Sequence, residues 1–196
     1  MQRPLTELEE AMLEIAKLAI EEEFVGRPLI DKQYYLSRFP ELAREGAVFV
    51  TLNKVRGGEE ILRGCIGSIL PRRPLIDDII YNAKAAAFSD PRFPPLRPEE
   101  LQNLEIEISL LSLPVKVEYT DKEDLRRKII PGKHGVILNL NGHQATFLPQ
   151  VWEKLPDFDL FFEHLCQKAG LPGNCLDYHP DIYVYTVKEF KKLWNQ

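Results

Sequence analysis

Cysteine is scarce in this sequence, with three residues in 196. The count is odd, and the residues, Cys65, Cys166 and Cys175, are widely spaced. This pattern excludes the dense disulfide framework of a small secreted protein. At least one thiol is therefore free. A disulfide between Cys166 and Cys175 stays an open alternative, and inert thiols are the favoured interpretation.

Long apolar runs and an excess of basic residues are also missing. The N-terminus has no apolar core of a signal peptide, and no later run approaches the length of a membrane span. The formal net charge of -5 disfavours general nucleic-acid or anionic-membrane binding, which needs surplus Lys and Arg to displace counterions. We therefore expect a cytoplasmic protein without membrane contact. RNA binding in a locally basic cleft is the least favoured alternative.

Cofactor and metal motifs are absent as well. The sequence has no phosphate-binding glycine loop, dinucleotide fingerprint or nucleophilic-serine elbow. Four zinc-ligand types do occur close together, at His164, Cys166, Cys175 and His179. Residues two apart on a helix point about 200° away from each other, which argues against a shared metal at His164 and Cys166. We predict no metal site, and the cofactor stays unknown.

The apolar pattern that is present predicts an α+β fold with a mainly antiparallel sheet flanked by helices. Thr6 and Glu9 form a capping box that starts a helix ending at Gly26. Gly57-Gly58 and Asn141-Gly142 each separate two apolar runs, as in antiparallel hairpins. Further helices are predicted within 31–44, from Pro74 to Ser89, and over 121–130, 158–169 and 188–194, with further strands over 105–111 and 182–187.

The domain prediction is a single unit spanning residues 1–196. Within it we expect a smaller, mostly helical lobe from 27–45 plus 149–179, packed on the main sheet lobe with a cleft between them. No internal repeat or linker divides the chain.

The segment Leu62-Arg63-Gly64-Cys65-Ile66-Gly67 is the candidate functional centre. Simple strand alternation places Arg63, Cys65 and Gly67 on one face, and Leu62, Gly64 and Ile66 on the other, where Leu62 and Ile66 anchor the core. A guanidinium beside a thiol favours the nucleophilic thiolate. Two glycines inside a strand indicate a bulge or a close approach, and Gly67 is expected to leave an open slot beside the sulfur.

A purely structural interpretation competes with this one. Cys65 would then be a small buried apolar side chain, Gly64 would accommodate a packed helix, and Arg63 would reach a carboxylate. Cysteine catalysis also needs a base, and the sequence places no histidine beside Cys65, with His134 and His143 expected to be exposed.

Three residues outside the segment are candidate ligand contacts. Asp90 and Arg92 flank a proline in a loop that follows a helix, where binding groups are common, although a turn and a solvated arginine explain them equally. Gln150 lies at a strand-to-helix transition and offers an amide, with helix capping as the alternative.

The segment 62–67 resembles the signature of the AMMECR family, which includes the AmmeMemoRadiSam system protein A group. Residues 89–96, 105–112, 146–152 and 165–171 resemble further blocks of that family in the same order, so the resemblance covers nearly the whole chain. It implies two lobes, a cleft near the signature, and association with a Memo-like protein and a radical SAM enzyme. Any iron-sulfur cluster would belong to that enzyme, because three scattered cysteines cannot supply four thiolates.

Two hypotheses for function follow. In the first, the protein binds or acts on a small anionic or nucleotide-like ligand in a cleft at Arg63 and Cys65, which are the candidate catalytic residues. Gly64, Gly67, Asp90, Arg92 and Gln150 then contact the ligand. In the second, the same segment is a docking surface of a non-catalytic scaffold. The sequence does not decide whether the protein is an enzyme, and it leaves the oligomeric state open.

Overall fold

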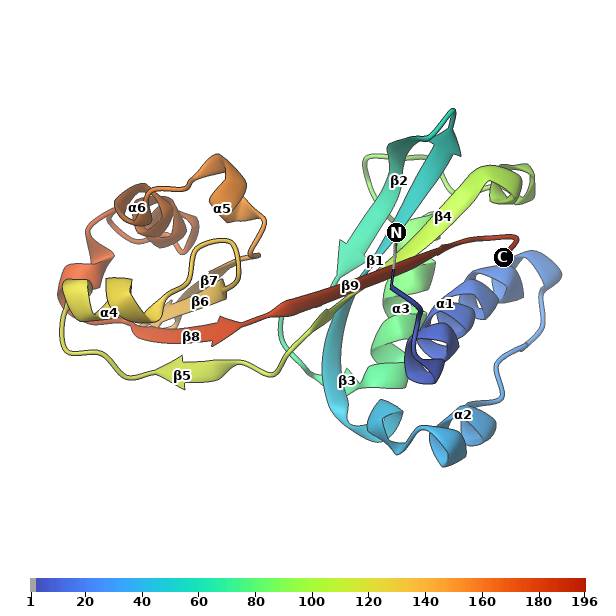
Figure 1. Cartoon of the computed structure of the whole chain (residues 1–196), viewed down its shortest axis with the longest axis horizontal. Coiled ribbons are helices and arrows are strands. Elements are labelled where there is room, and N and C mark those ends of the chain that lie inside the picture. The colour runs from blue at the N-terminus through green and yellow to red at the C-terminus, as the bar shows by residue number, and fades with distance from the viewer. Residues whose placement is uncertain (1–2) are drawn as a thin grey trace. The chain divides into compact units, whose positions relative to one another are not determined.

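The chain folds into two compact units, which we call unit 1 (1–111 with 188–196) and unit 2 (112–187). The structure is a computed structural model that describes residues 3–196. The α+β fold class with antiparallel sheets is confirmed in both units (Figure 1).

Unit 1 is a sheet with two helices on one face (Figure 1). Its strands run in the order β2-β1-β4-β9, and the short β3 pairs with β1. Val48, Val50 and Leu52 of β1 and Ile106 and Ile108 of β4 form the sheet side of the core. The elements are α1 (Glu7–Val25), α2 (Lys32–Arg38), a 3-10 turn (Pro40–Ala43), β1 (Glu45–Arg56), β2 (Glu59–Gly67), β3 (Arg73–Pro74), α3 (Leu75–Phe88), a 3-10 turn (Pro98–Asn103), β4 (Leu104–Leu111) and β9 (Val187–Leu193).

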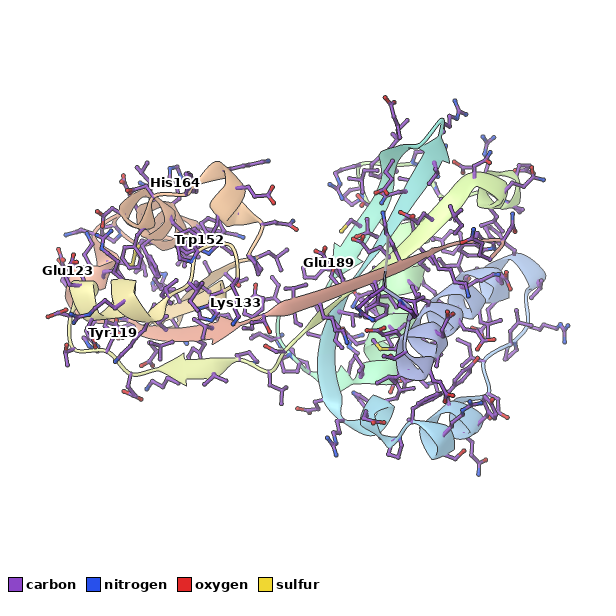
Figure 2. The ribbon with its side chains drawn as sticks, in the orientation of Figure 1. Tyr119, Glu123, Lys133, Trp152, His164 and Glu189 are labelled. Atoms are coloured by element: carbon purple, nitrogen blue, oxygen red, sulfur yellow. A yellow bond between two sulfur atoms is a disulfide. The ribbon has the colours of Figure 1, made fainter. Side chains whose placement is uncertain are left out.

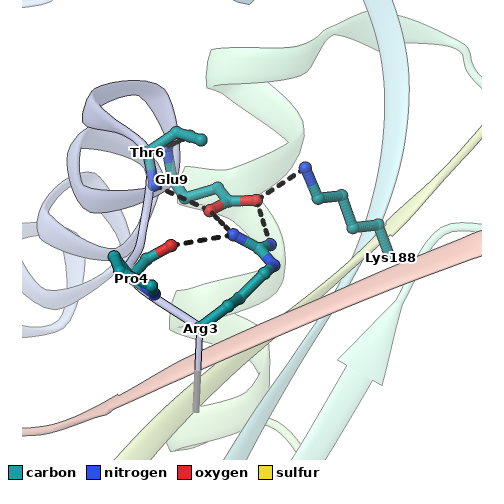
Figure 3. A network of polar contacts seen from close by, with 5 residues as sticks. All are labelled: Arg3, Pro4, Thr6, Glu9 and Lys188. Carbon is teal, nitrogen blue, oxygen red and sulfur yellow. Dashed lines mark hydrogen bonds and ion pairs between the residues drawn. The ribbon is translucent and has the colours of Figure 1, made fainter.

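The predicted capping box is confirmed at the start of α1, and its carboxylate has a second role. Glu9 accepts from the Thr6 amide at 2.9 Å while its own amide donates to the Thr6 hydroxyl. The same buried carboxylate binds both Arg3 and, at 2.8 Å, Lys188 (Figure 3). The Arg3 hydrogen bonds, ahead of that from Lys188, hold the pKa of Glu9 well below its usual range. Glu9 thus binds α1 to Lys188, the residue at which the chain returns to unit 1.

Unit 2 has its own sheet and its own core. The strand order is β5-β8-β6-β7, and the core is rich in aromatic side chains, with Trp152 stacked on Phe161 at 3.6 Å between centroids. Figure 2 labels Trp152 within this unit. The elements are β5 (Val115–Val117), α4 (Lys122–Lys128), β6 (Gly135–Leu140), β7 (His143–Phe147), α5 (Val151–Lys154), α6 (Phe158–Lys168), a 3-10 turn (Cys175–Tyr178) and β8 (Asp181–Tyr185).

Both hairpin predictions are confirmed. The turn residues Gly57, Gly58, Asn141 and Gly142 all have positive φ, as a two-residue hairpin turn of the I′ type requires. The predicted helix over 188–194 is wrong, because this segment is strand β9 beside β4. Pairing with a strand far away in the sequence overrides its local helical pattern.

The two units divide the chain differently from the expected lobes. Residues 27–45 belong to unit 1, where Tyr35 and Leu42 enter the core. Unit 2 is built on a four-stranded sheet and is therefore not mostly helical. The reason is that residues 112–148, expected in the main sheet lobe, contain β5, β6 and β7, and β5 and β6 pair with β8 in the unit 2 sheet. Within residues 3–196 no helix has the length and apolarity needed to span a membrane.

Candidate functional site

Segment 62–67 forms the C-terminal end of β2, the edge strand of the unit 1 sheet, and contains a β-bulge. Leu52 of β1 pairs with Gly64 and Asn53 pairs with Leu62, so Arg63 is the extra residue. The bulge breaks the simple alternation and places Leu62 on the face that carries Cys65. Leu62 is 40% exposed, so the prediction that it anchors the core is wrong. Ile66 does pack against the core, as expected.

Arg63 is directed onto a carboxylate and not onto the thiol. Its side chain is buried, with Nε 2.9 Å from Glu100 Oε1 and Nη2 2.8 Å from the Pro94 carbonyl. Lys54 binds the same Glu100 at 2.6 Å. The Arg63 hydrogen bonds, followed by that of Lys54, lower the pKa of Glu100 to about 2. Among residues 3–196, no hydrogen bond joins Arg63 to Cys65, and the Arg63 Nη1 is buried without a partner.

The two glycines of the segment allow two close approaches. A Cβ at Gly64 would overlap the carbonyl oxygen of Ala86, so the strand and α3 pack backbone to backbone here. A Cβ at Gly67 would overlap the ring of Phe49, its partner on β1. The expected open slot at Gly67 is therefore filled by an aromatic ring.

Cys65 is the free cysteine of the chain and is half-buried. Its Sγ accepts from the Thr51 hydroxyl at 3.3 Å. Thr51 pairs with Cys65 on one side and with Glu107 of β4 on the other. Directly opposed residues share a face of a sheet, so Cys65, Thr51 and Glu107 form one row across three strands, here called the Cys65 row.

Asp90 and Arg92 complete the surroundings of Cys65. The buried Asp90 carboxylate accepts from the Cys65 amide at 2.9 Å and from Arg92 Nε and Nη2 at 3.0 and 2.8 Å. Arg92 Nη2 also donates to the Cys65 carbonyl at 3.3 Å. The Arg92 hydrogen bonds, ahead of the Cys65 amide, hold the pKa of Asp90 well below its usual range. The arginine that contacts Cys65 is thus Arg92, whose side chain is 55% exposed.

Glu107 is the acidic end of the Cys65 row. Burial, followed by the nearby Glu189 of β9, raises the pKa of Glu107 above its usual value. Figure 2 labels Glu189 on this strand. Sequence reasoning missed Thr51 and Glu107 as site residues. The alternation of Glu105, Ile106 and Glu107 was the signal, because it predicts a strand with one polar face.

The remaining candidates lie in unit 2. Gln150 is exposed at the N-terminus of α5 and makes no side-chain capping bond. All four histidines are in this unit, so unit 1 contains no imidazole base for Cys65. His143 is exposed as expected, whereas His134 is half-buried and accepts from the Ile130 amide at 3.1 Å.

Cys166 and Cys175 form a disulfide, contrary to the favoured interpretation of two inert thiols. The bridge joins α6 to the following 3-10 turn inside the unit 2 core. Neither sulfur is then a thiolate ligand. In the part of the chain that the structure describes, no group of three or more His, Cys, Asp or Glu side chains is arranged to hold a metal ion.

The fold and the site together define a two-unit α+β protein with a thiol held on a bulged edge strand. A family model described as AMMECR1 matches residues 13–190, and the chain belongs to this family. A Thermococcus gammatolerans protein is 38% identical over 98% of this chain and 94% of its own. A Methanothermobacter thermautotrophicus protein is 39% identical over 90% and 89%. The crystal structure of uncharacterized protein PH0010 from Pyrococcus horikoshii is similar with a TM-score of 0.75 and 35% identity, covering 96% of this chain and 93% of that one.

Proposed function

We propose that unit 1 binds and acts on a small anionic or nucleotide-like ligand at the surface around Cys65. The observation that carries the proposal is the contact of Asp90 and Arg92 with the Cys65 backbone. This contact fixes the backbone of a residue with a half-buried thiol to an exposed guanidinium. Such a pair suits a ligand with an electrophilic centre next to a negative group.

Arg92 is the contact for the negative group. Its Nε and Nη2 face Asp90, and among the described residues its Nη1 makes no hydrogen bond. A guanidinium held in place by a carboxylate loses little freedom when it binds an anion, which favours binding. Arg63 has a positioning role in this proposal, because it ties the bulge to Glu100 and leaves only the buried Nη1 for a ligand group.

The Cys65 row supplies the groups for chemistry. Cys65 is the nucleophile, and the Thr51 hydroxyl donates a hydrogen bond to its sulfur and so orients it. Glu107 exchanges a proton with the ligand, a role that suits a carboxyl group whose pKa is raised by burial and by Glu189. It lies two strand spacings from Cys65, about 10 Å, a distance that a small ligand can span.

Alkylation of Cys65 by a neutral and an anionic reagent tests the proposal. The intact disulfide removes Cys166 and Cys175 from the reaction. We expect the ratio of the iodoacetate rate to the iodoacetamide rate to be higher for Cys65 than for a model thiol, because Arg92 attracts the anionic reagent. Arg92→Gln should lower that ratio to the value of the model thiol. Arg97→Gln, an exposed arginine in the same loop, is the matched control. Labelling that begins only in the alkaline range of a model thiol and shows no preference for the anion would rule out a nucleophilic Cys65.

A scaffold function is the second candidate, and exposed apolar side chains favour it. Ile61 and Leu62 are 50% and 40% exposed on the edge strand β2. An edge strand with exposed apolar residues can accept a strand from another protein. The family resemblance points to a Memo-like protein or a radical SAM enzyme as partner.

Co-purification from native extract separates the two candidates. A scaffold predicts that Ile61→Lys removes the bound partner and leaves Cys65 labelling unchanged. Recovery of no partner with the original chain would count against scaffolding.

A further inference from the structure

A groove of about 400 Å³ runs along α1 in unit 1, and the Cys65 row does not line it. Its base is a polar stripe of α1 with helical spacing: Glu7, Glu10, Glu14 and Lys17. One wall is α2 and the residue after it, and the other is the end of β9 and the residues that follow. The volume lies at the low end of the about 300–1,000 Å³ usual for ligand pockets.

Two of the acidic residues in the groove are already neutralised. Glu7 pairs with Arg38 of α2 at 3.2 Å, and Glu10 pairs with Lys192 of β9 at 2.7 Å. Each pair joins α1 to one wall. These four charges cancel one another and leave no net charge of their own.

Glu14 and Lys17 differ from these pairs. Lys17 Nζ donates to the Trp194 carbonyl at 2.6 Å and lies 5.6 Å from the Trp194 ring centroid, so its partners are uncharged. The exposed Glu14 lies against Tyr35, and burial, followed by this carboxylate, raises the pKa of Tyr35. Within residues 3–196 neither Glu14 nor Lys17 forms an ion pair with another side chain. The groove thus holds one anion and one cation whose partners, the Tyr35 hydroxyl and the Trp194 carbonyl, carry no charge.

We propose that this groove binds a free α-amino acid with an apolar side chain. Glu14 receives the α-ammonium group, and Lys17, which retains two of its three N–H donors, receives the α-carboxylate. Residues three apart on a helix lie on the same face, and both Glu14 and Lys17 line the groove, so one ligand can meet both charges. The aromatic rings of Tyr34 and Phe39, in the wall formed by α2 and the residue after it, offer apolar contact to the side chain.

Calorimetry on the full chain with three probes tests the proposal. L-phenylalanine carries both charges, N-acetylphenylalanine lacks the ammonium, and phenylalaninamide lacks the carboxylate. We expect phenylalanine to bind, and each capped probe to bind at least about tenfold more weakly, equal to about 1.4 kcal/mol. Equal affinity for the three probes, or no heat with phenylalanine at about 10 mM, would overturn the proposal.

Variants assign each charge to its residue. Glu14→Gln is expected to weaken phenylalanine binding about tenfold and to leave the affinity for N-acetylphenylalanine, which lacks the ammonium group, unchanged. Lys17→Gln is expected to weaken phenylalanine binding by a similar factor and to leave the affinity for phenylalaninamide, which lacks the carboxylate, unchanged. Glu21→Gln, on α1 outside the groove, is the control that keeps full affinity. Unchanged phenylalanine affinity in Glu14→Gln and Lys17→Gln would assign binding elsewhere and refute the site. Cys65 labelling is independent of this outcome, so the two proposals stand or fall separately.

Discussion

Unit 1 and unit 2 differ in what they bury. Unit 1 buries charged side chains within its sheet and helices, namely Glu9, Arg63, Asp78, Asp90 and Glu105. Unit 2 buries aromatic rings and a disulfide, and its buried polar residue, among those described, is Thr146. A buried charge is stable only with its partners in place, whereas an apolar core depends on packing and on chain constraints. Unit 1 should therefore respond to loss of a partner and to acid, and unit 2 to loss of its disulfide.

Each unit contains one buried tryptophan, which allows this comparison to be measured. Trp194 reports unit 1 and Trp152 reports unit 2. Replacing one tryptophan by phenylalanine leaves the other as a fluorescent probe of denaturant unfolding.

The largest expected effect is that of Arg63→Met. It leaves the Glu100 carboxylate without its first partner, and we expect unit 1 to lose about 3 kcal/mol of unfolding free energy, at the low end for a broken buried pair because Lys54 stays. Urea unfolding at Trp194, in a Trp152→Phe background, gives the value. Arg97→Met, an exposed neighbour, should change it by less than about 0.5 kcal/mol. An equal loss of unfolding free energy measured at Trp152, in a Trp194→Phe background, would contradict independent unfolding of the units.

Removing the disulfide is expected to have the next largest effect, in unit 2. The bridge closes a sequence separation of 9 residues, for which loop entropy gives about 2.5 kcal/mol. The double variant Cys166→Ala/Cys175→Ala should lower the unfolding free energy at Trp152 by this amount and leave the Trp194 transition in place. Cys65→Ala is the control, since that thiol is unpaired. A shift confined to Trp194 would refute the assignment of the bridge to unit 2 stability.

Acid should destabilise unit 1 in a defined pH window. Because the pKa of Glu100 falls from its ordinary 4.5 to about 2 in the folded chain, its contribution is present above pH 4.5 and is lost as pH falls toward 2. Glu9 and Asp90, whose pKa values are also lowered, act with the same sign. The free energy of unfolding measured at Trp194 should therefore fall as the pH drops through this window, and it should fall less steeply in Glu100→Gln. An identical pH profile in that variant would contradict the prediction.

The smallest expected effect is the response of unit 2 to pH through His134. Burial, followed by Lys133, lowers the pKa of His134, and its Nδ1 accepts a hydrogen bond that the protonated ring cannot accept. A lowered pKa means that this contribution is complete above pH 6.5 and is lost as pH falls through the folded value. Stability at Trp152 should begin to decline below pH 6.5, and His134→Gln should remove that slope. His164→Gln, which changes an exposed histidine of the same unit, is the control.

The sequence predicted candidate residues for the site and not the contacts that these residues make. Segment 62–67 lies in a strand, as predicted, and Asp90 and Arg92, predicted from their loop as ligand contacts, bind the backbone of Cys65. The expected Arg63–Cys65 pair failed because strand alternation assumes an unbroken ladder, and the bulge interrupts it. Thr51 and Glu107 join the row through pairing across three strands, which sequence spacing does not reveal.

The sequence by itself determined the features that depend on neighbouring residues: the capping box at Thr6, the hairpin turns at Gly57-Gly58 and Asn141-Gly142, and the motif of the family. Only the tertiary structure decided that 187–193 is a strand, that Cys166 bonds Cys175, and that Arg63 binds Glu100, 37 residues away. The physical reason is the distance along the sequence between the residues that interact. Turns and caps are fixed by local backbone geometry, whereas a buried charge or an edge strand takes the partner that folding brings to it.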